Sequence, residues 1–135
     1  MERSNSRRAV RSGAAIAVIL TVALMHAFRV GSYLEGDLFN LYYSFASDIL
    51  IPIAAYFLLV LNEINWANFL RKGWVKAGLV VGAAVFAEIL QGFGIPLLGS
   101  TFDPLDLLMY PLGAAAALLL DRFLIALLSR GRESR

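Results

Sequence analysis

Residues 41–61 of the chain read LYYSFASDILIPIAAYFLLVL, an apolar run that carries a single charged side chain, Asp48. A helix needs roughly 20 consecutive apolar residues to cross the hydrocarbon core of a bilayer, and this run has that length. Further apolar runs lie before and after it. The first of them reaches a spanning length only when Ala9, Val10 and Val30 at its ends are included. The sequence therefore predicts an all-α membrane bundle of four transmembrane helices, at residues 9–30, 41–61, 74–93 and 104–128.

The composition agrees with a chain that is solvated by lipid. Of the 135 residues, 59% are hydrophobic and 16% are charged, whereas soluble domains carry about 25% charged residues. A backbone in lipid must satisfy its own hydrogen bonds, and the alternating polarity of barrel strands is absent, so helices are expected. The chain has no cysteine, which excludes disulfides and thiolate metal sites. A net charge of +2 with few solvated residues argues against a nucleic-acid partner.

Basic residues gather before the first predicted helix, between the second and third, and after the fourth. They are Arg3, Arg7, Arg8 and Arg11, then Arg71, Lys72 and Lys76, then Arg130, Arg132 and Arg135. The positive-inside rule then places both termini, including a short basic tail at 129–135, in the cytoplasm of a multi-pass plasma-membrane protein. A cleaved signal peptide is the alternative for the first segment, but Phe28 and Arg29 make a poor cleavage site, which favours a retained helix.

Several acidic residues interrupt the apolar runs, although a charge near mid-membrane costs about 2.5–3.5 kcal/mol. With a rise of about 1.5 Å per residue, Asp48 and Glu88 lie in one layer near the outer face. Asp103 and Asp106 begin the fourth helix at the same face, with Asp103 as its N-cap before Pro104. Four carboxylates from three helices thus converge in the outer half of the bundle.

Spacing along the helices extends this group. Gln91 lies three residues after Glu88, on the same helix face. Tyr110, Gly113 and Ala117 continue the stripe that Asp106 begins, and their small members permit a close helix contact. Gly78 and Gly82 form a second pair of small residues. Pro52 removes a backbone hydrogen bond near Asp48, which indicates a kink or a pocket wall.

At these residues the chain resembles the VanZ-like family of small integral membrane proteins. The resemblance covers residues 48–118 and rests on EILQ at 88–91, STFDPLD at 100–106, and the Asp48 and Tyr56 ends of DILIPIAAY at 48–56. The chain departs from the family pattern where basic or amide residues are usual. Ser100 replaces an arginine, Tyr110 an asparagine, and Ile49 and Pro52 a lysine and a histidine. Arg29, at the outer end of the first helix, is then the basic residue expected to pair with the acidic group.

The resemblance implies a role in the cell envelope and in glycopeptide (teicoplanin) tolerance, without implying a reaction. We expect a network or ligand site at Asp48, Glu88, Gln91, Asp103, Asp106, Tyr110 and Arg29. Three interpretations remain open for it. The side chains could lock the helices together by hydrogen bonds, or they could take part in catalysis. They could also bind a lipid or cell-wall-precursor head group, an ion or a partner membrane protein. No catalytic motif, metal motif or cofactor loop supports an enzyme. A small proton- or cation-coupled transporter or channel subunit, oligomeric because four helices make a narrow path, is the alternative function.

Asp121 and Arg122, towards the end of the fourth predicted helix, are expected to pair with each other near the cytoplasmic interface.

Overall fold

The computed structural model describes residues 2–63, 68–95 and 104–130, and every regular element within these ranges is a helix. Four long helices dominate them: α1 (Glu2–Ala27), α3 (Ser47–Asn62), α4 (Gly73–Gly92) and α5 (Asp106–Arg130). Stretches that are long and apolar enough to cross a membrane run over Ser6–Ala27, Gly36–Asn62, Gly73–Gly92 and Asp106–Ser129. The prediction of an all-α chain with four helices of spanning length and composition is therefore confirmed.

Shorter helical elements connect the long ones. They are the 3₁₀-helix η1 (Val30–Tyr33), α2 (Gly36–Leu41), the π-helical turn η2 (Tyr42–Ala46) and the 3₁₀-helix η3 (Asn68–Arg71). Because α2 and η2 run directly into α3, the second apolar helix begins at Gly36, five residues before the predicted start at 41.

The ends of two helices also differ from the sequence prediction. α1 ends at Ala27 instead of residue 30, because Arg29 takes a left-handed backbone conformation with φ 48°. α5 begins at Asp106, and the carbonyl of Leu105 accepts hydrogen bonds from the amides of Leu108 and Met109. Leu105 therefore has the hydrogen-bonding role of an N-cap, although Pro104 was expected to be the first helical residue. Asp103 lies outside the described residues.

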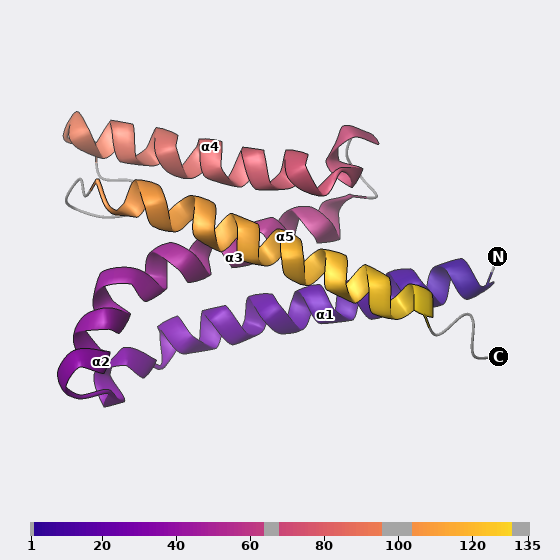
Figure 1. The fold of residues 1–135 in the computed structure, drawn as a ribbon, viewed down its shortest axis with the longest axis horizontal. Coiled ribbons are helices and arrows are strands. Elements are labelled where there is room, and N and C mark those ends of the chain that lie inside the picture. The colour runs from indigo at the N-terminus through magenta and orange to yellow at the C-terminus, as the bar shows by residue number, and fades with distance from the viewer. Residues whose placement is uncertain (1, 64–67, 96–103, 131–135) are drawn as a thin grey trace.

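The four long helices lie side by side, and both chain termini are at the same end of the bundle (Figure 1). We call this end the terminal end. The opposite end, where α1 gives way to α2 and where α4 ends and α5 begins, is called the far end. Helices α3 and α5 form the middle of the bundle, with α1 and α4 on either side of them (Figure 1). Consecutive long helices run in opposite directions.

The packed interior is small and lies along α3 and α5. Its buried members are Ala15, Tyr56, Phe57, Val60, Val80, Ala114 and Ala117. Two helices approach each other closely at Gly113, where a Cβ atom would lie 2.4 Å from the backbone oxygen of Ile49. Gly113 therefore permits the contact between α3 and α5 that its small-residue stripe indicates. Gly78 and Gly82 face open space instead, so they do not bring α4 close to another helix of this chain.

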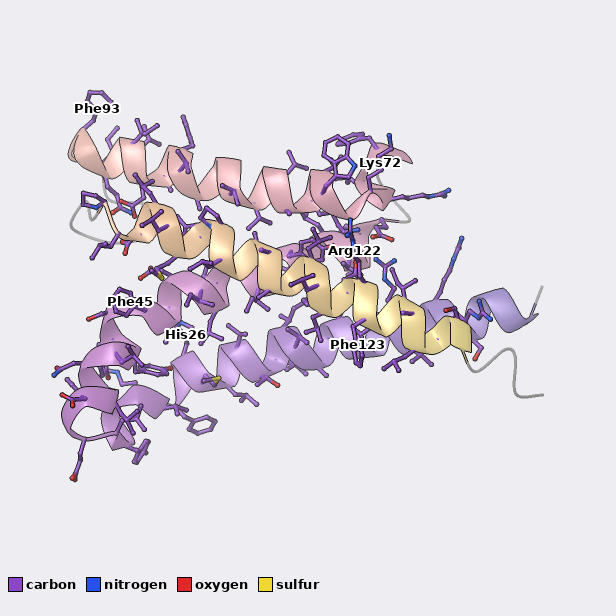
Figure 2. All side chains as sticks on the ribbon, viewed as in Figure 1. His26, Phe45, Lys72, Phe93, Arg122 and Phe123 are labelled. Atoms are coloured by element: carbon purple, nitrogen blue, oxygen red, sulfur yellow. The ribbon has the colours of Figure 1, made fainter. Side chains whose placement is uncertain are left out.

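Large apolar side chains cover the outside of the bundle. Leu20, Phe86, Leu112, Leu119 and Phe123 are each 55–66% exposed, and Phe93 projects from the end of α4 away from the other helices (Figure 2). An apolar exterior around a thin core is what a chain solvated by lipid requires.

Candidate functional site

Two polar regions lie inside the bundle, one at each end. At the terminal end, Arg11 of α1 joins helices that are far apart in the sequence. Its Nε and Nη2 atoms donate hydrogen bonds of 2.8 Å to the two carboxylate oxygens of Asp121 on α5. Its Nη1 and Nη2 atoms donate at 2.7 and 2.9 Å to Glu63, which follows α3. One guanidinium therefore makes bidentate contacts with two carboxylates, the strongest geometry available to such pairs.

Lys76 and Tyr56 complete this region. The Lys76 side chain is fully buried, and its Nζ atom donates to Glu63 Oε1 and, at 3.3 Å, to the backbone oxygen of Leu70. It also lies 3.9 Å from Asp121 Oδ2, which accepts a 3.0 Å hydrogen bond from the Tyr56 hydroxyl. We call Arg11, Tyr56, Glu63, Lys76 and Asp121 the ion-pair cluster. It holds two cations against two carboxylates, so the buried charges cancel.

The ion-pair cluster was not predicted from the sequence, where Arg11 and Lys76 served only to set the topology. The expected local pair of Asp121 with Arg122 is wrong, because adjacent residues on a helix do not face each other. Asp121 points inward to Arg11, whereas Arg122 is exposed. A signal was present in the sequence: charges of opposite sign lie at similar depths inside different apolar helices, and such charges are expected to pair.

The second polar region lines a cavity of about 870 Å³ between α3, α4 and α5, which extends from the far end past the middle of α3 and α4. We call it the acidic cavity. Its polar lining consists of Asp48, Glu88, Gln91, Asp106 and Tyr110. The rest of its wall is apolar and comes from Ile51, Pro52, Ala55, Leu58, Leu59, Leu79, Val80, Ala83 and Ala84. The cavity thus has a polar group of side chains beside a long apolar surface.

Glu88 is the most deeply buried acidic residue of this cavity, with 2% of its surface exposed. Its Oε1 atom accepts a 2.7 Å hydrogen bond from the Tyr110 hydroxyl. Its Oε2 atom is buried and has no hydrogen-bond partner among the described residues. Asp48, Gln91 and Asp106 each make polar or electrostatic interactions of their own. A buried acceptor without a donor costs about 1–3 kcal/mol, so the Oε2 atom is a place where a bound group can supply a missing donor.

Backbone features place these side chains around an opening. Pro52 of α3 has no N–H to donate to the carbonyl of Asp48, and Pro111 of α5 has none for the carbonyl of Leu107. Both prolines therefore interrupt the regular backbone hydrogen bonding of their helices near the polar lining. Gly113 holds α5 against α3 beside Ile49, which keeps Asp106 and Tyr110 on the cavity side of α5.

The structure brings together five of the residues predicted for the site: Asp48, Glu88, Gln91, Asp106 and Tyr110. Asp103 lies outside the described residues. Arg29 is exposed in the turn after α1, does not line the cavity, and takes part in no ion pair within the described ranges. None of the described residues that line the acidic cavity is basic. The expected pairing of Arg29 is therefore absent for Asp48, Glu88 and Asp106, the acidic residues of this group that the structure describes.

Across the part of the chain that the structure describes, no three His, Cys, Asp or Glu side chains are placed to hold a metal ion together. The polar groups that the described lining of the acidic cavity offers are the carboxyl groups of Asp48, Glu88 and Asp106, the amide of Gln91 and the hydroxyl of Tyr110.

Comparison with known proteins adds no assignment, since no family model, curated protein or solved structure matches the chain.

Proposed function

We propose that the protein is a non-catalytic, multi-pass plasma-membrane protein whose acidic cavity binds the polar head group of an amphipathic molecule. The observation that carries this proposal is Glu88 Oε2, a buried acceptor without a partner beside a cavity of about 870 Å³. A purely structural network would satisfy its buried acceptors internally. An unpartnered acceptor on a residue that lines a cavity favours binding over helix locking.

The orientation of the protein in the membrane is part of the proposal. Arg7, Arg8 and Arg71 lie at the terminal end, and the positive-inside rule places such residues in the cytoplasm. Lys72 lies at the same end of the bundle, beside the start of α4 (Figure 2). The far end then faces outward, and the acidic cavity lies in the outer half of the membrane. A membrane-borne ligand reaches it laterally from the outer leaflet.

The chemistry of the lining restricts the ligand. Asp48, Glu88 and Asp106 supply carboxylate acceptors, and no arginine, lysine or histidine is among the described residues that line the cavity. The carboxylates would repel a phosphate head group, whereas a hydroxyl, amide or ammonium group would donate the hydrogen bond that Glu88 Oε2 lacks among the described residues. The apolar wall suits a hydrocarbon tail. The sugar and peptide portions of a cell-wall precursor offer such donors, which fits the envelope role and glycopeptide tolerance that resemblance to the VanZ-like family implies.

The experiment compares Glu88→Gln with wild type for lipids that co-purify with the protein, identified by native mass spectrometry. Glutamine keeps the size of the side chain and an oxygen for the Tyr110 hydroxyl, but it places an NH₂ group at one of the two positions. We expect the variant to lose a bound amphipathic molecule that the wild type retains. Glu35→Gln, an exposed glutamate at the far end, is the matched control and keeps it. Equal retention by wild type and Glu88→Gln would contradict the proposal.

A second function is favoured by the same atom. An unpaired carboxylate oxygen inside an apolar helix bundle is also suited to carrying a proton or cation, and an oligomer would supply a wider path than four helices. Proteoliposomes distinguish this transporter or channel subunit from a binding protein. A transporter or channel subunit is expected to give proton or cation flux that falls in Glu88→Gln and persists in Glu35→Gln. Flux equal to that of empty liposomes excludes it.

A further inference from the structure

A second cavity, of about 340 Å³, lies at the terminal end and is separate from the acidic cavity. Its lining consists of Arg8, Arg11, Ser12, Val60, Glu63 and Arg71. Arginines from the start of α1 and from η3 thus face one space, although they are far apart in the sequence. We call this space the arginine cavity.

The carboxylates near the arginine cavity are already engaged. Both oxygens of Glu63 accept hydrogen bonds from Arg11, and one of them also accepts from Lys76. Asp121 accepts from Arg11 and Tyr56. Arg8 and Arg71 take part in none of the ion pairs found within the described ranges, and both are exposed. The lining therefore holds three guanidinium groups against one carboxylate, an excess of positive charge.

The depth of the arginine cavity matters as much as its charge. Arg8 is two residues inside the start of the apolar stretch Ser6–Ala27, and Glu63 directly follows the stretch that ends at Asn62. Arg71 precedes the stretch that starts at Gly73 by two residues. Three lining residues thus stand at the ends of three candidate spans. In a bilayer, this is the level at which lipid phosphates lie.

We propose that the arginine cavity binds a phosphate group, with Arg8 and Arg71 as its direct ligands. The planar guanidinium donors match phosphate oxygens in a bidentate geometry. The Ser12 hydroxyl offers a further donor from the cavity wall. The ion pairs with Glu63 and Asp121 hold Arg11 in place, so its positive charge has a fixed position in the cavity wall. At this depth the head group of an anionic lipid is the nearest source of phosphate, and free phosphate from the aqueous side is the other.

The site has a structural consequence for the terminal end. Arg8 belongs to α1 and Arg71 to the 3₁₀-helix before α4, so one phosphate would bridge two elements that lie on opposite sides of α3 and α5. Arg11 already links α1 to α5 and to the end of α3 by hydrogen bonds. The bound phosphate would add a link from α1 to the 3₁₀-helix before α4.

The test uses the full chain in detergent micelles with phosphatidylglycerol or phosphatidylcholine added, and native mass spectrometry counts the retained lipids. Arg8→Gln and Arg71→Gln remove exposed side chains, so both variants are expected to fold. We expect each to retain about fivefold less phosphatidylglycerol than wild type, since one basic residue near an anionic surface contributes about that factor. Arg29→Gln, an exposed arginine at the far end, is the matched control and retains the wild-type amount.

Further variants and a phosphate arm separate the outcomes. Arg8→Lys and Arg71→Lys keep the charge and are expected to restore part of the retention that the glutamine variants lose. Stabilisation of lipid-free protein by inorganic phosphate, dependent on Arg8 and Arg71, would support the site with free phosphate as its source. Phosphatidylglycerol retention that depends on these arginines without that effect would support the lipid source. Wild-type lipid retention in both glutamine variants together with no stabilisation by inorganic phosphate, or an equal loss of retention in Arg29→Gln, would overturn the proposal.

Discussion

The ion-pair cluster and the acidic cavity are both polar regions in an apolar bundle, but they differ in whether cations accompany their carboxylates. In the ion-pair cluster, the Arg11 and Lys76 cations neutralise Glu63 and Asp121. In the acidic cavity, carboxylates meet no basic side chain in the lining, and Glu88 Oε2 has no hydrogen-bond donor among the described residues. A closed network of this kind holds helices together, whereas an open acceptor beside a cavity is available for a ligand.

The largest effect is expected from breaking the ion-pair cluster. Asp121→Ala removes a partner from Arg11 and Tyr56 and leaves the buried Lys76 with less compensation. Removing one member of a buried ion pair typically costs about 3–5 kcal/mol, so we expect a large fall in the thermal unfolding temperature in detergent. Asp37→Ala, at an exposed position, is the control and should change the stability by less than about 1 kcal/mol.

The coupling within the cluster can be measured as well. Arg11→Ala and Asp121→Ala together are expected to cost less than the sum of the two single changes, because the second change removes a charge that the first left unpaired. Strictly additive effects would mean that the two side chains do not interact in the folded protein.

A smaller effect is expected from Tyr110→Phe in the acidic cavity. The change removes the hydroxyl that donates to Glu88 Oε1, so neither oxygen of that carboxylate then has a donor among the described residues. An unsatisfied buried acceptor costs about 1–3 kcal/mol, and the unfolding temperature should fall accordingly. Tyr33→Phe, at an exposed tyrosine of the far end, removes the same hydroxyl without this cost. Equal unfolding temperatures for wild type and Tyr110→Phe would show that the Tyr110–Glu88 bond contributes nothing.

The smallest effect on stability is expected from Glu88→Gln. The amide oxygen can still accept from Tyr110, and the change removes a buried charge that lacks a partner, so the stability should shift by less than about 1 kcal/mol. The same unfolding experiment checks this. A loss as large as that of Asp121→Ala would place Glu88 in a structural network and remove the contrast between the two regions.

The sequence predicted the four long apolar helices and the convergence of Asp48, Glu88 and Asp106 because both depend on one-dimensional properties. Apolar length defines a spanning helix, and the rise per residue places Asp48, Glu88 and Asp106 at one depth. The ion-pair cluster was missed because Arg11 and Asp121 are 110 positions apart and meet only through the rotation of their helices. The same limit applies to Gly78 and Gly82, whose spacing indicates a contact that this chain does not make. The pairing of Arg29 with the acidic group was predicted because no residue pattern indicates the left-handed backbone conformation of Arg29.

The contrast between the two regions is tested most directly by labelling with dicyclohexylcarbodiimide, a membrane-soluble reagent that adds to carboxyl groups. Peptide mapping by mass spectrometry then locates the adduct in the protein reconstituted in vesicles. We expect an adduct at Glu88, which lines an open cavity and has an oxygen without a partner among the described residues, and none at Glu63 or Asp121, whose oxygens accept hydrogen bonds from Arg11 and Lys76. Adducts at Glu63 or Asp121 with Glu88 unmodified would contradict the assignment of a closed ion-pair cluster and an open acidic cavity.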